Sequence, residues 1–421
     1  MRMRFTAKVL VCLAFLSLAP AAQAASTYVV RFDHWSEGDE RGYRDFVAAL
    51  GEDGCNTVDA CLHSAANPYR SSDPAGTVFE SDCSDLPYVL RFYYAWKRGL
   101  PFSYEDGVLP RSGSRDFRYS RNGNYVTSRR DVAGGTQSGI AIINQISAAV
   151  SSASYRIHPD LDFPLVPDTY SPAIDPKSIR PGTLIYDPNG HLAIVYRVDP
   201  DGRIRYLDAH PDSTLTRSVY DLRFTRTVPA AGAGFKNWRP QKLVGATLRA
   251  DGTLTGGHIE LARNAGIADF STEQFYGNDT RPDDAAWASG WFKLNGDITG
   301  YYDFVRAKLS GGQLHFDPIK EVHEMVLSNC SDLQYRVQAV EVAIAAGDPA
   351  PSRARAAAGQ HLRHRRRLGD LLLAVARCAA EDRVQGTARR GGALRHHVRA
   401  RRRSAPVLSR QRHGGRSDPD L

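Results

Sequence analysis

Cys83 and His191 have the side chains of a nucleophile and its base, although they lie far apart in the chain. Ser84 or Asp85 can cap a helix that runs to Arg98, so we expect Cys83 at the start of that helix. Unpaired N–H groups and the helix dipole stabilise a thiolate there and lower the pKa of the cysteine. A thiolate with a histidine partner is the nucleophile that amide chemistry needs.

A third residue should orient the imidazole. His191 begins a predicted strand, and Asp208 lies at the end of the next strand, with the turn Asp199-Pro-Asp-Gly202 between them. Asp208 then lies directly across the hairpin, where its carboxylate could accept the ring N–H of His191. His210 is the alternative third residue.

The cysteines allow a second interpretation. Five remain after residue 24: Cys55, Cys61, Cys83, Cys330 and Cys378. We expect a Cys55–Cys61 disulfide that closes a small loop and leaves Cys83 free. The short sequence around Cys83 recurs around Cys330, however, and a Cys83–Cys330 disulfide would make both cysteines structural.

The positioning elements follow from local patterns, and together they predict an α+β fold. Apolar residues recur at helical spacing through residues 86–98, and Gly99 followed by Pro101 ends that helix. The other expected elements are strands over Tyr28–Phe32, His191–Val198 and Arg203–Leu207, helices over Glu37–Leu50, Ser138–Ala153, Val322–Leu327 and Leu333–Ile344, a polar loop over 107–130 and a hairpin at Asp251-Gly252.

The N-terminus has the pattern of a secretory signal peptide over residues 1–24. Basic residues precede an apolar stretch from Val9 to Leu18, and the small residues Ala22-Gln23-Ala24 follow it. We therefore expect cleavage before Ala25, no membrane span afterwards, and a periplasmic or secreted protein in a compartment that permits disulfides. We expect a hydrolase domain over 25–240 and an accessory α+β region over 241–347.

The formal net charge of +8 belongs to the C-terminal segment. Residues 348–421 contain 18 arginines, no lysine and 6 acidic residues, so the rest of the chain is mildly acidic. A nucleic-acid-binding face is therefore not expected on the body. Arginine-rich sequence without lysine or aromatics is typical of a GC-rich gene translated out of frame. We therefore interpret 348–421 as a disordered, frameshifted tail. The alternative is a basic arm that binds an anionic polymer.

Neither a metal nor another cofactor is expected. The glycines form no phosphate-binding pattern. The histidines outside the candidate site lack the spacing of zinc ligands; they include His34, His63, His158, His258 and His323.

The motifs around Cys83 and His191 resemble those of NlpC-type papain-like cysteine peptidases. Asp82-Cys-Ser-Asp-Leu86 and Gly99-Leu-Pro101 are similar to the family's DCSGL and GxxLP. Pro181-Gly-Thr-Leu-Ile-Tyr186 and Gly190-His-Leu-Ala-Ile-Val195 are similar to PGDLVFF and HVGIY, and Asn67-Pro-Tyr69 lies where the family has its PY. The resemblance covers roughly residues 67–210. Asp85 departs from the pattern because it replaces a glycine, and the Cys, His, Asp order also resembles transglutaminase-like relatives.

The resemblance implies a papain-like fold, in which a helix packs on an antiparallel sheet, and a thiol hydrolase of the cell wall. Cys83, His191 and Asp208 would form the catalytic triad, and Tyr69 would contact the substrate. The substrate would be an amide in a peptidoglycan stem peptide. The other hypothesis is a non-catalytic secreted binding or structural module on the same fold, with Cys83 in a disulfide.

Overall fold

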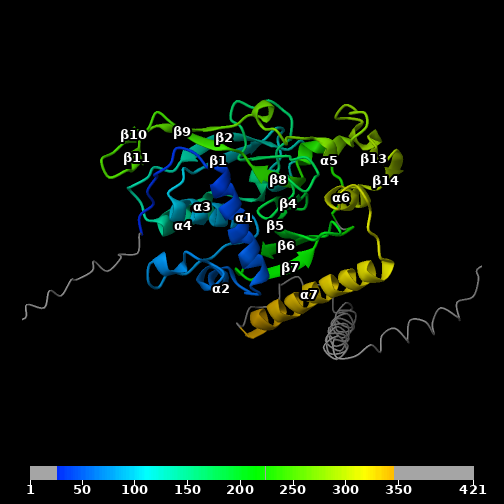
Figure 1. The fold of residues 1–421 in the computed structure, drawn as a ribbon, viewed down its shortest axis with the longest axis horizontal. Helices are drawn as coiled ribbons and strands as arrows, with labels where there is room; N and C mark the ends of the chain where they lie inside the picture. The colour runs from blue at the N-terminus through cyan, green and yellow to red at the C-terminus, as the bar shows by residue number, and fades with distance from the viewer. Residues whose placement is uncertain (1–25, 223, 346–421) are drawn as a thin grey trace, which may run out of the picture. The chain divides into compact units, whose positions relative to one another are not determined.

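The protein has an α+β fold in a computed structural model that describes residues 26–222 and 224–345 (Figure 1). The expected signal peptide, the Arg-rich tail and Cys378 lie outside the described residues. The chain divides into one compact unit that ends at Met325 and another that begins at Val326. The helices are α1 (Glu37–Glu52), α2 (Val58–His63), α3 (Leu86–Arg98), α4 (Gly139–Ala149), α5 (Glu273–Tyr276), α6 (Tyr301–Leu309) and α7 (Pro318–Ala345).

A six-stranded antiparallel sheet forms the centre of the first unit, in the order β3-β8-β4-β5-β6-β7. The hairpin between β5 and β6 forms at the predicted turn, where Asp199 N–H donates to Arg203 O at 2.7 Å. Gly202 is required there because its φ is +77° and a Cβ would lie 2.1 Å from the carbonyl oxygen of Arg306. The strands are β3 (Thr169–Tyr170), β4 (Leu184–Asp187), β5 (His191–Val198), β6 (Ile204–Ala209), β7 (Leu215–Val219) and β8 (Gly234–Trp238).

Helices α1 and α3 cover one face of this sheet, and α4 packs against α3. Helix α1 begins at Ser36, whose Oγ accepts a hydrogen bond from the N–H of Asp39 at 3.1 Å. Helix α3 is buried from Leu86 to Trp96. It packs through Tyr88 against Trp238 of β8, with ring centroids 4.8 Å apart. The side chains that alternate along β5 on this face join the same hydrophobic core as the helices.

The C-terminal part of the first unit covers the opposite face. Ala193 and Val195 of β5 point into a second core that contains Phe292, Phe304 and Val305. Figure 1 shows α6, β13 and β14 on the side of the sheet opposite to α1 and α3. Residues 241–325 therefore share a compact unit with the strands that carry the candidate site, and no boundary between compact units falls at residue 240.

Several elements differ from the sequence-based expectations. The expected polar loop over 107–130 contributes to an antiparallel pair, in which Val108 lies opposite Val126. The expected strand Tyr28–Phe32 makes only isolated bridges, such as Val30 with Leu254. The two helices expected near the C-terminus are one helix, α7, so Cys330 lies within a helix and not at its start. The paired strands outside the central sheet are β1 (Ser103–Pro110), β2 (Asn124–Asp131), β9 (Gln241–Val244), β10 (Thr247–Leu248), β11 (Leu254–Thr255), β12 (His258–Leu261), β13 (Phe292–Leu294) and β14 (Asp297–Thr299).

Candidate active site

Cys83 lies in the turn that leads directly into α3. The carboxylate of Asp82 accepts hydrogen bonds from the backbone N–H of Ser84 at 2.7 Å and of Asp85 at 3.1 Å. Asp85, one of the two expected residues, occupies the N-cap position of α3, but its side chain makes no capping hydrogen bond. Asp82 instead orders the turn before the helix. Among the described residues, nothing accepts a hydrogen bond from the backbone N–H of Cys83.

The structure places the thiol of Cys83 close enough to His191 to contribute to the raised pKa of its imidazole. His191 is the first residue of β5, and its side chain is 42 % exposed, so solvent and ligands can reach it. Cys83 is a free thiol. The alternative Cys83–Cys330 disulfide is therefore not formed.

Asp208 orients His191 from the neighbouring strand. His191 Nε2 and Asp208 Oδ2 are 2.7 Å apart, which leaves the other ring nitrogen for Cys83. Burial acts to lower the pKa of His191, but the hydrogen bonds with Asp208 and Cys83 outweigh it and raise that pKa from 6.5 to about 10. The pair thus favours an imidazolium ion at neutral pH.

Two residues lie behind Asp208: Thr216, which was not foreseen from the sequence, and His210, the alternative third residue. The hydroxyl of Thr216 on β7 donates to Asp208 Oδ1 at 2.6 Å. His210 Nε2 lies 3.0 Å from the same hydroxyl. The His210 ring also stacks beside His191, with centroids 6.3 Å apart. Asp208 is thus the residue bonded to His191, while His210 bonds to Thr216.

Two buried residues lie close to Cys83. Burial first, and then the charge of Asp82, raise the pKa of Asp85 to about 7. The hydroxyl of Tyr155 donates to the carbonyl of Ser84 at 2.8 Å and fixes the turn that carries the thiol. The sequence signal for Asp85 was its departure from the glycine of the resembling motif, whereas Tyr155 had none.

Tyr69 is not brought to this site. Its ring packs against Phe46 and Tyr94, with centroid distances of 6.2 and 5.8 Å. Tyr94 lies near the C-terminal end of α3, whereas Cys83 precedes its N-terminal end. Tyr69 is thus a packing residue, because the aromatic core around α1 and α3 takes up its ring.

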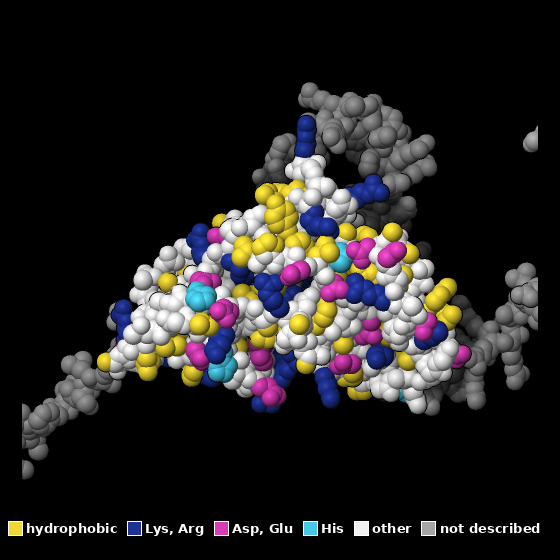
Figure 2. Space-filling model, turned by 90° about the horizontal axis from the view of Figure 1, so that it is seen from above, with side chains coloured by type: hydrophobic (Ala, Val, Ile, Leu, Met, Phe, Trp, Pro, Cys, Tyr) yellow, Lys and Arg dark blue, Asp and Glu magenta, His cyan; other side chains and the backbone are white. Residues whose placement is uncertain are grey.

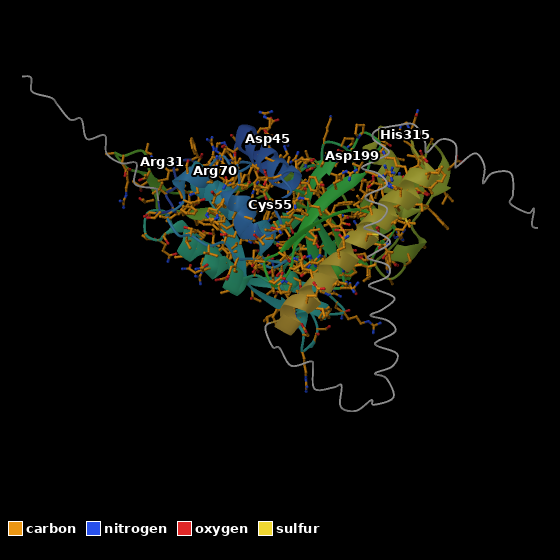
Figure 3. The ribbon with its side chains drawn as sticks, turned by 90° about the horizontal axis from the view of Figure 1, so that it is seen from below. Arg31, Asp45, Cys55, Arg70, Asp199 and His315 are labelled. Carbon is orange, nitrogen blue, oxygen red and sulfur yellow. A yellow bond between two sulfur atoms is a disulfide. The ribbon has the colours of Figure 1, made fainter. Side chains whose placement is uncertain are left out.

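The predicted Cys55–Cys61 disulfide is present, with a Cα–Cα distance of 5.2 Å. Figure 3 shows Cys55 in the blue N-terminal part of the ribbon, beside the green strands. Arg217 of β7 donates to the carbonyl oxygens of Cys55 and Gly51, each at 2.6 Å. The disulfide loop is therefore fastened to the sheet by an arginine.

The described residues contain no group of three or more His, Cys, Asp or Glu side chains arranged to hold a metal ion. Nor does the described part of the chain contain a helix long and apolar enough to span a bilayer. On the face seen in Figure 2, basic and acidic side chains are interspersed and are not separated by sign.

Comparison with known proteins gave no match to a family model, to a curated protein or to a solved structure.

Proposed function

We propose that the protein is a thiol hydrolase in which Cys83, His191 and Asp208 form a catalytic triad on a papain-like fold. The proposal rests on one observation, the arrangement in which Asp208 holds the imidazole of His191 beside a free thiol at the start of a buried helix. A nucleophile, a base and an orienting carboxylate in this order are the parts that covalent acyl transfer requires.

The chemistry follows from these contacts. Cys83 transfers its proton to His191, and the thiolate attacks the carbonyl carbon of an amide. The unpaired N–H of Cys83 donates a hydrogen bond to the oxyanion that forms. His191 then protonates the leaving amine as the C–N bond breaks, and a thioester to Cys83 remains. His191 takes a proton from water, the hydroxide attacks the thioester, and the acid product leaves with the thiol restored.

We propose an amide in a peptidoglycan stem peptide as the substrate, in a periplasmic or secreted setting. Support comes from the motifs that resemble NlpC-type peptidases and from the signal-peptide pattern. The Cys55–Cys61 disulfide is compatible with an oxidising compartment.

The test is incubation of the purified protein with peptidoglycan stem peptides, followed by mass spectrometry of the products. The wild type should cleave an amide, and Cys83→Ala should lower the rate at least a hundredfold while its thermal unfolding stays unchanged. Equal rates in the two proteins would contradict the proposal.

His191→Gln should lose activity to a similar extent. His258→Gln is its matched control, because His258 is an exposed histidine on β12 whose ring contacts Glu260. Its rate should equal that of the wild type.

The second candidate is a non-catalytic binding module on the same fold. The motif resemblance would favour this binding module over an enzyme only if the thiol of Cys83 were unreactive. Iodoacetamide labelling of the native protein separates the two candidates, because a module without catalysis has no need of a reactive Cys83.

A further inference from the structure

A pocket of about 250 Å³ lies on the first unit, between the segment from Ile157 to Ser171 and the end of β8. None of Cys83, His191 and Asp208 lines it. Its lining mixes apolar side chains, such as Leu161, Phe163 and Val166, with polar ones, and the buried Lys236 and Arg239 are among the latter. It is therefore separate from the candidate active site.

Lys236 is a buried amine that has no partner. It is only 4 % exposed, and it lies opposite Leu184 of β4 on the face of the sheet that α3 covers. No described residue accepts a hydrogen bond from its Nζ or forms an ion pair with it. An unpaired ammonium group in such a place is costly, because burial disfavours its charged form.

Two other buried polar atoms near Lys236 also lack hydrogen-bond partners. Arg239 is 2 % exposed and donates to Ala262 O at 2.9 Å and to Asn264 Oδ1 at 2.6 Å. Its Nε has no partner, and neither does Oε2 of the buried Glu105. Asp168, the other buried carboxylate, is already paired with Arg129.

The carboxylates at the rim do not compete for Lys236. Asp160 pairs with Arg281 at 2.5 Å, and Asp162 pairs with Arg263 at 2.9 Å. An anion that enters the pocket would therefore find the amine of Lys236 available.

We propose that this pocket binds a small monocarboxylate with a short apolar chain, its carboxylate accepting a hydrogen bond from the ammonium group of Lys236. The apolar part of the lining, which includes Leu161 and Phe163, suits a short hydrocarbon chain, and the buried amine suits one negative charge. A dianion such as phosphate fits less well, because the carboxylate of Asp168, close to Arg239, would repel its second charge.

The titration of Lys236 agrees with this site. Burial lowers the pKa of Lys236 to about 7, although the charge of Glu105 partly opposes the shift. A bound carboxylate would favour the ammonium form, so binding at pH 8 should take up a proton. Glu105 and Arg239 act on that amine, and the Arg129–Asp168 pair acts on Glu105. His158 and Tyr170 are further buried titratable residues of the pocket lining.

The experiment uses the full chain and N-acetylalanine as the probe, with N-acetylalaninamide as its neutral analogue. Calorimetry should give at least tenfold weaker binding for the amide, which corresponds to about 1.4 kcal/mol. Lys236→Met, which keeps the length of the side chain, should weaken binding of N-acetylalanine at least tenfold. Titration at pH 8 in two buffers of different ionisation enthalpy should reveal proton uptake by the wild type.

Lys242→Met is the matched control, since Lys242 is an exposed lysine on β9 outside the pocket, and it should bind as the wild type does. Equal affinity for the acid and the amide, or unchanged binding in Lys236→Met, would overturn the proposal. Tighter binding of inorganic phosphate than of N-acetylalanine would overturn the choice of a monocarboxylate. If Lys236→Met does not fold, two measurements on the wild type still test the proposal. They are its affinity for N-acetylalanine relative to N-acetylalaninamide, and its proton uptake on binding.

Discussion

The protonation state of His191 decides how the candidate site can work. In the folded protein its pKa is raised to about 10, mainly because hydrogen bonds with Asp208 and Cys83 outweigh the effect of burial. The unfolded chain has the ordinary value of about 6.5. The resulting stabilisation is fully present below about pH 6.5 and is lost as the pH rises through about 10.

Asp208→Asn should therefore move the titration midpoint of His191 down towards 6.5, because the amide removes the negative charge beside the ring. NMR titration of the assigned His191 ring protons measures this midpoint. The variant should also lose less stability than the wild type between about pH 6.5 and 10. A wild-type midpoint already near 6.5 would contradict the arrangement.

Thr216 acts on His191 only through Asp208, so it is a positioning residue. Thr216→Val should lower kcat by about fivefold, since a single hydrogen bond contributes on the order of 1 kcal/mol, and should leave KM unchanged. Thr214→Val is a suitable comparison because Thr214 bonds to Asp212 in an exposed turn. A change confined to KM would show that Thr216 acts in another way.

At the scale of single residues, the sequence predicts part of the candidate site but not all of it. Cys83 and His191 stand at the ends of elements that local patterns define, and the turn at Gly202 aligns Asp208 across the hairpin. Thr216 and Tyr155 could not be foreseen, because strand pairing and tertiary packing bring them to the site. Tyr69 was misassigned to the site because spacing along the chain does not determine which part of the fold its ring packs against.

The packing of α1 on the sheet determines how closely that helix approaches β5. Gly51 lies against Tyr196, and a Cβ at Gly51 would lie 2.2 Å from Cγ and 2.3 Å from Cβ of the tyrosine. Gly51→Ala should destabilise the protein by about 1–3 kcal/mol, because neither atom can move without the strand. Chemical unfolding measures the loss.

Gly38→Ala is the matched control in the same helix. The nearest atom to a Cβ there is Ser36 Oγ at 3.5 Å, an ordinary contact. Alanine should be neutral or should stabilise the helix by up to about 1 kcal/mol. Equal destabilisation by both substitutions would mean that the contact with Tyr196 does not govern the effect at Gly51.

Elements with strong local signals were predicted well. The range of β5 was correct, and α1 extends two residues beyond its predicted end. Helix α4 begins one residue after its predicted start, Ser138, and ends four residues before its predicted end, Ala153. The pair formed by β1 and β2 was missed because Arg, Ser, Gly and Asn between and within the strands indicate loop. Its pairing depends on contacts distant in sequence, which override local propensity.

At the scale of the whole molecule, the second core connects the C-terminal region to the sheet. Phe304 of α6 is fully buried there. Phe304→Ala should destabilise the protein by about 3–5 kcal/mol and should unfold the region around His191 in the same transition. Tryptophan fluorescence and hydrogen exchange at β5 measure the two events.

Phe316 provides the comparison, because the same type of side chain is 55 % exposed there. Phe316→Ala should change stability by no more than about 0.5 kcal/mol. Separate transitions for β5 and α6 would indicate that the region after residue 240 folds independently of the sheet.

The buried arginine after the β5–β6 turn also sets an order of events during synthesis. Arg203 is 1 % exposed and pairs with Glu321, which follows it by 118 residues. Glu321 also accepts a hydrogen bond from Arg306, whose guanidinium donates to Asp201 O in the same turn. At about 5–20 residues per second, the ribosome adds those residues in about 6–24 s. Throughout that interval Arg203 has its ion pair with Asp201 but not the one with Glu321, so the hairpin that carries His191 and Asp208 gains this contact only near the end of translation of the first unit.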